Sequence, residues 1–326
     1  MMGYRFDPEL VDAAGQFPAP DLTDLASARF SSVQRAKPVE PHPFVRDEEF
    51  GLDRGAGCSA LRARVYRPRD NDELMPALLH LHSGGYVMGS IDATHARNQR
   101  LSYELGAVVV AVDYRLAPEH PYPAALDDAV AAFTWLVAES ECLRVDQSRI
   151  VLHGRSAGGG LAASLALKLR DLRREDDGQV RSLPEPCFQY LAAPQLDDTT
   201  STASMRLFVD TPMWSQSAAE ASWAYYLGPG VPGTADVSEY AAPARATDLA
   251  GLPPAYIAAM EFDPMRDEAL NYSRALAAAG VQVEAHLFPG TFHCSAVLVD
   301  AAVSRRELDE ERAVLHAALW GHSGNG

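Results

Sequence analysis

Short apolar runs alternate with longer stretches of helical periodicity over most of the chain. Apolar runs of about four to eight residues between turn residues indicate buried strands, whereas apolar positions three or four residues apart indicate helices. The expected strands cover 61–66, 78–82, 107–112, 149–153, 187–192, 255–260 and 281–288. The expected helices cover 92–105, 124–139, 161–169, 267–279 and 296–319. This alternation predicts an α/β fold whose mostly parallel central sheet is covered by helices on both faces.

Two segments do not follow this alternation. Residues 1 to about 50 are polar, rich in proline and weakly periodic, with one expected helix at 21–34. Residues 204–227 form a long helical stretch with many large apolar side chains, where a short crossover between two strands would suffice. We expect the segments from 1 to about 50 and from about 198 to 236 to form a helical cap on a single α/β domain. The alternative is that 204–227 is an ordinary crossover helix with a buried aromatic face.

Composition and charge narrow the classes of partner. Of the 326 residues, 47% are hydrophobic and 22% charged, so a large packed core is expected rather than disorder. The net charge of -16 argues against nucleic acids and anionic membranes as partners. No apolar stretch approaches the roughly 20 residues of a membrane-spanning helix, and the N-terminal residues show no apolar run of the secretory type. The four cysteines lack zinc-type or C-x-x-C spacing, so we expect no metal site and a reduced, cytoplasmic location.

A serine between glycines stands at an expected strand-to-helix turn. Gly154 and Gly158 flank Ser156, which follows the strand 149–153 and precedes the helix 161–169. Such a turn is the arrangement of a nucleophile elbow, which pushes the serine Oγ clear of the sheet. Glycine is needed on both sides because a side chain would collide with the crossing strand and helix. Ser156 is therefore the candidate nucleophile of a hydrolase.

A serine alcohol needs a base to take its proton and a group that orients the base. Of the ten histidines, His293 follows a core strand on a loop opened by proline and glycine, at the kind of strand end where α/β sites lie. Asp263 follows the strand 255–260 and is the candidate acid. The order serine, aspartate, histidine is that of the α/β-hydrolase triad. Cys294 is an alternative nucleophile beside His293, but it lacks an elbow.

Two glycines after the strand 78–82 offer backbone donors to an oxyanion. The amides of Gly84 and Gly85 can approach a developing charge because neither residue has a side chain. The amide of Ala157, which follows the candidate nucleophile, is the third candidate donor. Taken alone, a Gly-Gly pair after a strand is more typical of a plain strand-to-loop turn.

Five motifs together resemble the bacterial hormone-sensitive-lipase family of esterases, from about residue 60 to the C-terminus. They are 82–89 (HSGGYVMG), 113–127 (DYRLAPEHPYPAALD), 154–159 (GRSAGG), 263–268 (DPMRDE) and the loop of His293. The resemblance implies an α/β-hydrolase fold with a cap, no cofactor, and hydrolysis of carboxylic esters with short to medium acyl chains. It also suggests a homodimer that pairs through an edge strand of the sheet.

The resemblance also assigns a role to each candidate residue. It places the nucleophile at Ser156, the acid at Asp263 and the base at His293. The oxyanion donors that it implies are Gly84, Gly85 and Ala157, and His82 helps to hold the loop of the two glycines.

Two positions depart from the family pattern. Ser83 replaces the first glycine of the usual His-Gly-Gly-Gly, and its side chain restricts the backbone of the loop. Arg155 replaces the usual aspartate before the nucleophile. Either a local carboxylate holds this arginine, or its permanent charge alters the site in favour of acidic esters.

These features predict a serine esterase that acts on small carboxylic esters. With a histidine base, kcat/KM is expected to rise through roughly pH 6–7. We expect the substrate pocket to be lined by Tyr86, Val87, Phe208, Met213 and Trp214. An amide or carbamate hydrolase or an acyltransferase would use the same triad, and a non-catalytic binding protein would keep the fold without the activity.

Overall fold

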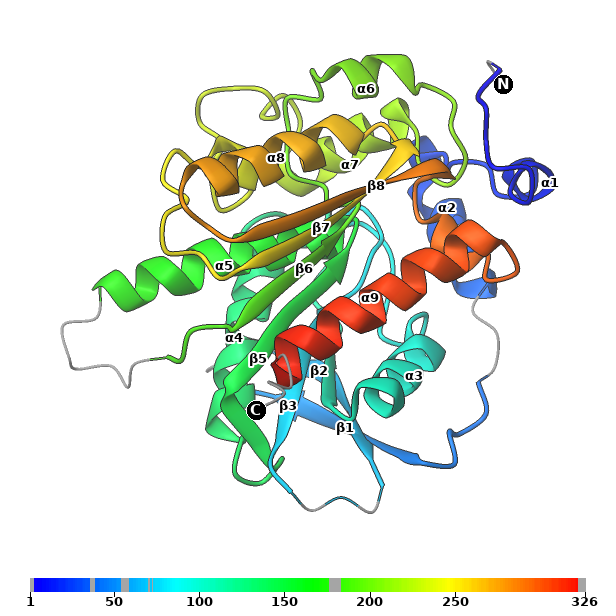
Figure 1. Cartoon of the computed structure of the whole chain (residues 1–326). Helices are drawn as coiled ribbons and strands as arrows, with labels where there is room; N and C mark the ends of the chain where they lie inside the picture. Colours follow the sequence, from blue (N-terminus) through cyan, green and yellow to red (C-terminus); the bar gives the residue numbers. More distant parts are fainter. Residues whose placement is uncertain are drawn as a thin grey trace.

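The computed structural model of the protein describes residues 3–35, 39–53, 59–69, 71, 73–175 and 183–321. In this part of the chain, eight strands form one sheet in the order β1-β2-β4-β3-β5-β6-β7-β8 (Figure 1). The strands are β1 (Val45–Leu52), β2 (Leu61–Pro68), β3 (Met75–Leu81), β4 (Val108–Val112), β5 (Val145–Arg155), β6 (Phe188–Ala192), β7 (Ala255–Phe262) and β8 (Val283–Phe292). Neighbours from β4 to β8 pair in parallel, whereas β2 runs antiparallel to β1 and β4. The expected α/β fold with a mostly parallel sheet is confirmed.

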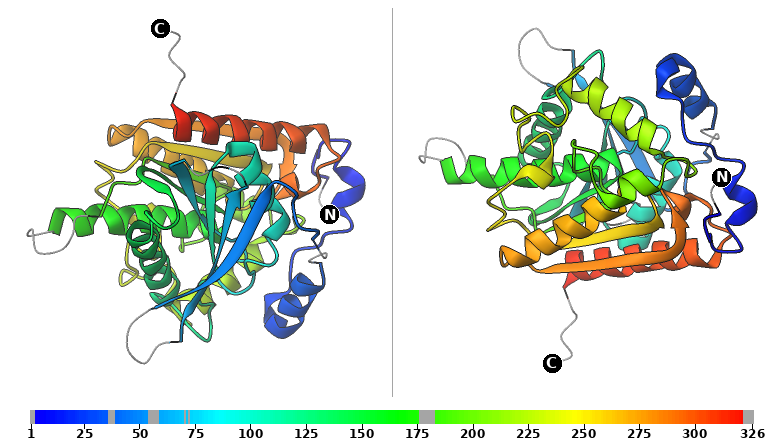
Figure 2. Two further views of the ribbon diagram at one scale, coloured as in Figure 1. Left: turned by 90° about the horizontal axis from the view of Figure 1, so that it is seen from below. Right: turned by 90° about the horizontal axis from the view of Figure 1, so that it is seen from above.

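Long helices cover both faces of this sheet (Figure 2). They are α3 (His95–Leu105), α4 (Ala124–Ala138), α5 (Ala157–Glu175), α8 (Arg266–Ala278) and α9 (Ala302–Trp320). Successive strand residues point to opposite faces. In β3, Leu79 and Leu81 pack in the core on the side of α4, α5 and α8, while Leu78 packs on the side of α3 and α9. Within the described residues, no helix combines the length and apolar character that crossing a bilayer requires.

The N-terminal segment joins the sheet earlier than its weak periodicity predicts. β1 is not an expected strand, because only Val45 and Leu52 at its two ends are buried. The residues between these ends are mostly exposed, so the sequence shows no apolar run there. Antiparallel pairing with β2 along the whole length of β1 holds the strand in the sheet. The segment outside the sheet therefore ends before Val45 rather than at about residue 50.

Several expected elements have different ends. β5 continues to Arg155, so the residue before Ser156 still belongs to the strand. The expected closing helix 296–319 is divided into a 3-10 helix, η3 (Ser295–Val297), and α9. A second 3-10 helix, η2 (Pro243–Arg245), precedes β7.

The helical stretch 204–227 consists of two helices rather than one. α6 (Ala203–Leu207) and α7 (Gln216–Leu227) are separated by an irregular segment. Ser215 caps α7 by accepting a hydrogen bond from the amide of Ala218, which gives this helix its own beginning.

The N-terminal helices pack against this same region. They are α1 (Val11–Ala14), the 3-10 helix η1 (Leu22–Asp24) and α2 (Leu25–Arg35). Leu22, Met205 and Trp214 share one buried apolar cluster, and the Tyr225 hydroxyl donates to the carbonyl of Leu22 over 3.0 Å. The two segments that break the strand–helix alternation are therefore in contact with each other.

Candidate active site

The turn between β5 and α5 holds Ser156 in a backbone conformation that side chains rarely adopt. Its φ is 58°, in the left-handed region. A Cβ at Gly154 would collide with the backbone of Gly158, and a Cβ at Gly158 would collide with the carbonyl of Leu81. Only glycine fits at either position, which is the local reason why the chain can make so sharp a turn.

Three side chains form a hydrogen-bonded chain at this turn. His293 Nε2 lies 3.0 Å from Ser156 Oγ, and His293 Nδ1 lies 2.7 Å from Asp263 Oδ2. All three residues are at most 3% exposed. The other carboxylate oxygen of Asp263 accepts from the amide of Met265 over 2.9 Å, which fixes its orientation.

Strand register brings the acid and the base together. Phe262 of β7 pairs with Phe292 of β8. The residues that follow them, Asp263 and His293, therefore leave neighbouring parallel strands at the same edge of the sheet. This edge is where β5 delivers Ser156.

Charge around His293 favours its protonated form. Burial on its own would lower the pKa of His293, but the carboxylate of Asp263 and the thiol of Cys294 outweigh burial and raise this pKa to about 10. The base form therefore becomes abundant only at alkaline pH, which moves the expected rise in kcat/KM upward from the pH 6–7 window.

The loop after β3 reaches the nucleophile, because Gly84 and Ser156 line the same cleft, whereas Gly85 is outside the described lining. Gly84 and Gly85 have φ values of 131° and 60°. A Cβ at Gly84 would collide with the carbonyl of Met88, and a Cβ at Gly85 would collide with the ring of Trp214. Ala157 begins α5, where the first amides of a helix have no intrahelical acceptor.

The side chain of His82 helps to hold this loop in place. Its Nδ1 lies 2.8 Å from the carbonyl oxygen of Ser83, and its ring stacks on Tyr114 at a centroid distance of 4.1 Å. The Tyr114 hydroxyl donates to the carbonyl of His82 over 2.7 Å. Burial lowers the pKa of His82, so the neutral ring donates from Nδ1 to Ser83.

A cleft of about 580 Å³ opens onto Ser156 and His293. Of the five expected pocket residues, Met213 and Trp214 belong to its lining. Tyr86, Val87 and Phe208 are buried outside the lining that the described residues provide. They turn into the core instead. Tyr86 stacks on Tyr226 at 4.0 Å, Val87 joins the cluster of Leu22, and Phe208 meets Phe262 edge-on.

Most residues that line the cleft could not be predicted from the hydrophobic pattern of the sequence. The wall comes from the N-terminal segment and from the loop around the oxyanion glycines, which contribute mostly small and polar residues. The lining residues of these two segments are Pro18, Ala19, Pro20, Asp21, Asp24, Ser27, Ala28, Ser31, Ser32, Ser83, Met88, Gly89, Ser90, Ala93 and Thr94.

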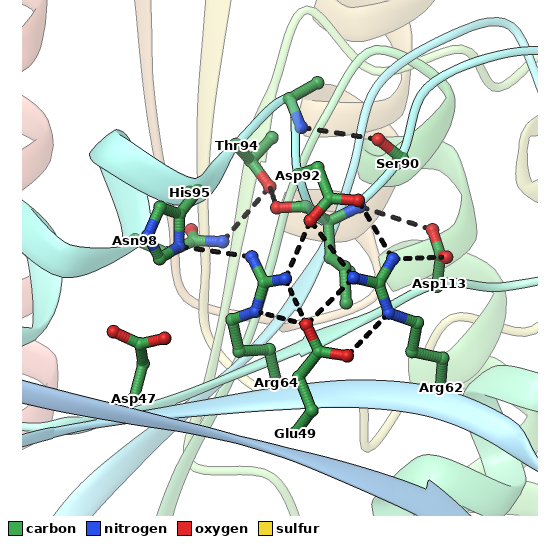
Figure 3. A network of polar contacts seen from close by, with 12 residues as sticks. Asp47, Glu49, Arg62, Arg64, Ser90, Asp92, Thr94, His95, Asn98 and Asp113 are labelled. Atoms are coloured by element: carbon green, nitrogen blue, oxygen red, sulfur yellow. Dashed lines mark hydrogen bonds and ion pairs between the residues drawn. The ribbon is translucent and has the colours of Figure 1, made fainter. Parts of the chain in front are cut away.

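An ion-pair network anchors one part of that wall to the edge of the sheet (Figure 3). Arg62 and Arg64 of β2 both bind Glu49 of β1. They also bind Asp92, at 2.9 Å and 2.7 Å respectively. Asp92 stands between lining residues Ser90 and Ala93, so the network holds this loop against the sheet.

Arg155 is held by a carboxylate from α9. Its Nη1 donates to Glu307 Oε1 over 2.6 Å, and the two residues are 8% and 0% exposed. Arg155 is outside the described lining of the cleft. This geometry matches the first of the two accounts of the arginine, in which a local carboxylate compensates its charge.

Cys294 also lines the cleft. It directly follows His293 and is partly buried, with a φ of 57°. It begins the short helix η3 rather than a strand-to-helix elbow.

Known proteins match this chain over most of its length. A family model of the alpha/beta hydrolase fold matches residues 78–297. Esterase LipI of Mycobacterium tuberculosis is 36% identical over 297 residues, which cover 86% of this chain and 87% of that protein. Ethyl acetate hydrolase of Pseudomonas putida is 34% identical over 235 residues, covering 72% of this chain and 70% of that protein.

The fold also closely matches a solved structure. A bacterial heroin esterase superposes with a TM-score of 0.91 at 41% identity, covering 97% of this chain and 98% of the other. The family match includes Ser156, Asp263 and His293 within its bounds. The chain therefore belongs to the α/β-hydrolase fold family and, within it, to the carboxylic ester hydrolases of the hormone-sensitive-lipase type.

Proposed function

We propose that the protein hydrolyses carboxylic esters of short acyl chain through an acyl-enzyme on Ser156. The observation that carries this proposal is the hydrogen-bonded chain from Ser156 and His293, which line the cleft, to the buried Asp263. A serine, an imidazole and a buried carboxylate in this order are the parts that acyl transfer needs.

The reaction follows from the position of each group. Ser156 Oγ attacks the ester carbonyl while His293 Nε2 takes its proton, and Asp263 stabilises the imidazolium that forms. The amides of Gly84, Gly85 and Ala157 stabilise the oxyanion, each donor typically contributing about 3 kcal/mol. His293 then returns the proton to the leaving alcohol. Water repeats the two steps on the acyl-enzyme and releases the acid.

The restriction to short acyl chains rests on Trp214. Its ring lies against Gly85, and its centroid is 5.9 Å from that of His293. The ring is backed by the buried cluster that includes Met205 and Met265, so it has little room to move. The curated relative from Pseudomonas putida is named for ethyl acetate, an ester of a two-carbon acid.

In this proposal, the helices α1, η1, α2, α6 and α7 form a cap over the active site. The N-terminal segment and the segment from about 198 to 236 both reach the cleft, through Pro18 to Ser32 and through Met213 and Trp214. They shield the acyl-enzyme from bulk water on the side away from the sheet. A homodimer through an edge strand stays a prediction, which light scattering of the purified protein would test.

Covalent labelling tests the assigned nucleophile. A fluorophosphonate probe should label the wild-type protein and leave Ser156→Ala unlabelled, because only an activated serine reacts. Matched p-nitrophenyl esters and anilides separate an esterase from an amide hydrolase. Labelling that persists in Ser156→Ala would show that the nucleophile is another residue, and absence of labelling in the wild type would favour a binding protein.

A further inference from the structure

Two carboxylates stand at the mouth of the cleft, where no lysine or arginine of the described residues opposes them. They are those of Asp21 and Asp24, which belong to the lining of the cleft. His293 also lines the cleft, but its ring is already paired with Asp263. A hydrogen bond from Thr23 lowers the pKa of Asp21, and one from Ser27 lowers the pKa of Asp24. Both aspartates are therefore ionised at neutral pH, and the mouth of the cleft is negative.

Packing fixes these carboxylates over the site. Arg29 of α2 donates to the carbonyls of Val87 and Ala117 over 2.7 Å and 2.8 Å, which ties the helix to the oxyanion loop. Its charge is compensated by Glu119 at 2.7 Å. Leu22, which stands between the two aspartates, is 2% exposed within the apolar cluster beneath the cleft. The negative mouth is thus part of the packed structure.

The inner end of the cleft holds a buried donor that lacks a partner. Trp214 lines the cleft and is 3% exposed, and its indole N–H has no hydrogen-bond partner in the described chain. A buried donor without a partner costs free energy that a ligand recovers by bringing an acceptor. This observation is independent of the carboxylates, and it indicates a ligand with an acceptor at the inner end. The ester group of a substrate is such an acceptor.

The position of His293 sets the side on which the alcohol leaves. His293 has to protonate the leaving oxygen, so the alcohol departs on the side of His293. Cys294 and Val297, which follow it in the chain, line the cleft together with Asp21 and Asp24. The acyl group then points the other way, towards the oxyanion loop and the ring that covers Gly85.

We infer that the protein prefers esters whose alcohol part carries a positively charged amine, which Asp21 and Asp24 attract at the mouth of the cleft. The inference rests on the proposed function, because it concerns the alcohol part of the ester that Ser156 cleaves. The attraction raises kcat/KM for the cationic ester and leaves a neutral ester of the same shape unaffected.

Two isosteric acetates test this preference. Acetylcholine and 3,3-dimethylbutyl acetate have the same shape, and differ in a quaternary nitrogen against a quaternary carbon. The variants are Asp21→Asn, Asp24→Asn and the double substitution, because asparagine caps a helix as well as aspartate does. Glu141→Gln is the matched control, since it removes an exposed carboxylate just before β5, at the end of that strand opposite Ser156.

The ratio of kcat/KM for the two acetates should fall about five-fold for each aspartate replaced. Comparing the ratio between variants cancels the intrinsic reactivity of the two esters. The neutral ester measures any general loss of activity in each variant, so only the ratio reports the charge effect, and Glu141→Gln should keep the wild-type ratio. Raising the salt from about 0.02 M to 0.5 M should weaken the preference of the wild type.

Three outcomes would overturn the inference. They are an unchanged ratio in the double variant, an equal change in Glu141→Gln, and no turnover of either acetate by protein that cleaves p-nitrophenyl acetate. Failure to cleave p-nitrophenyl acetate at all would instead count against the proposed function, so the two failures are distinguishable.

Discussion

Removing the charge of Arg155 should destabilise the protein strongly. This residue is 8% exposed, and it donates over 2.6 Å to Glu307, which is 0% exposed. Arg155→Met would leave the Glu307 carboxylate in the interior without its cation. Breaking a buried ion pair on one side typically costs about 3–5 kcal/mol. A folded domain has only about 5–15 kcal/mol of unfolding free energy, so the loss would be a large part of the total.

A second contact should keep the variant folded. His153 lies two residues before Arg155 on the same face of β5, and Glu311 lies one turn after Glu307 on α9. His153 Nε2 is 2.9 Å from Glu311, which also pairs with Arg97. The strand that carries the nucleophile is thus joined to α9 at two successive turns, and Arg155→Met removes only one of the two contacts.

Equilibrium unfolding in urea measures the effect. The double variant Arg155→Met/Glu307→Leu removes both charges and should recover most of the lost stability, because apolar pairs often replace a buried ion pair without loss. A double-mutant cycle of the four proteins gives the coupling free energy. A loss below about 1 kcal/mol in Arg155→Met, which is the range of an exposed pair, would show that the buried ion pair contributes little to stability. So would a double variant that is no more stable than the weaker single variant.

The remaining predictions concern the chemistry. Ser156→Ala should lower kcat about a thousand-fold or more without changing the midpoint of urea unfolding, and a smaller loss of kcat would contradict the assigned nucleophile. Because the pKa of His293 is raised to about 10, kcat/KM of the wild type should rise between pH 7 and pH 10. In Asp263→Asn, kcat/KM should be lower and should level off at a lower pH. A wild-type profile that is flat above pH 7 would argue against a raised pKa. Trp214→Ala should raise the hexanoate-to-acetate ratio of kcat/KM about ten-fold or more, and an unchanged ratio would remove Trp214 as the limit on acyl length. Gly85→Ala, at a φ of 60° against that ring, should lower kcat more than it changes KM, and a wild-type kcat would show that the loop tolerates a side chain there.

Most strands and helices of the fold are predictable from the local pattern of apolar and polar residues. Buried strands and amphipathic helices can be recognised because the period of apolar positions matches the geometry of each element. The elbow was equally readable, since Gly154 and Gly158 are required by contacts within the turn itself and with the neighbouring strand. The order of Ser156, Asp263 and His293 along the chain then assigned roles before any distance was known.

The surroundings of these residues depend on contacts between distant segments, which the local pattern does not contain. β1 was missed because its side chains are mostly exposed and its pairing with β2 supplies what holds it. The sequence places Tyr86 and Val87 in the pocket because they follow the oxyanion glycines, and Phe208 because it lies in the expected cap segment. Whether a side chain faces a cleft or the core depends, however, on how distant segments pack.

The same reason explains the partner of Arg155 and the polar wall of the cleft. Glu307 is separated from Arg155 by 152 positions, and nothing in the local pattern of α9 marks it as the partner of the nucleophile's neighbour. The wall comes from a weakly periodic N-terminal segment, whose place over Ser156 is set by the burial of Leu22 and the hydrogen bonds of Arg29. Local periodicity fixes elements because it is a property of neighbouring residues, whereas the shape and charge of the cleft arise from contacts between residues far apart in the chain.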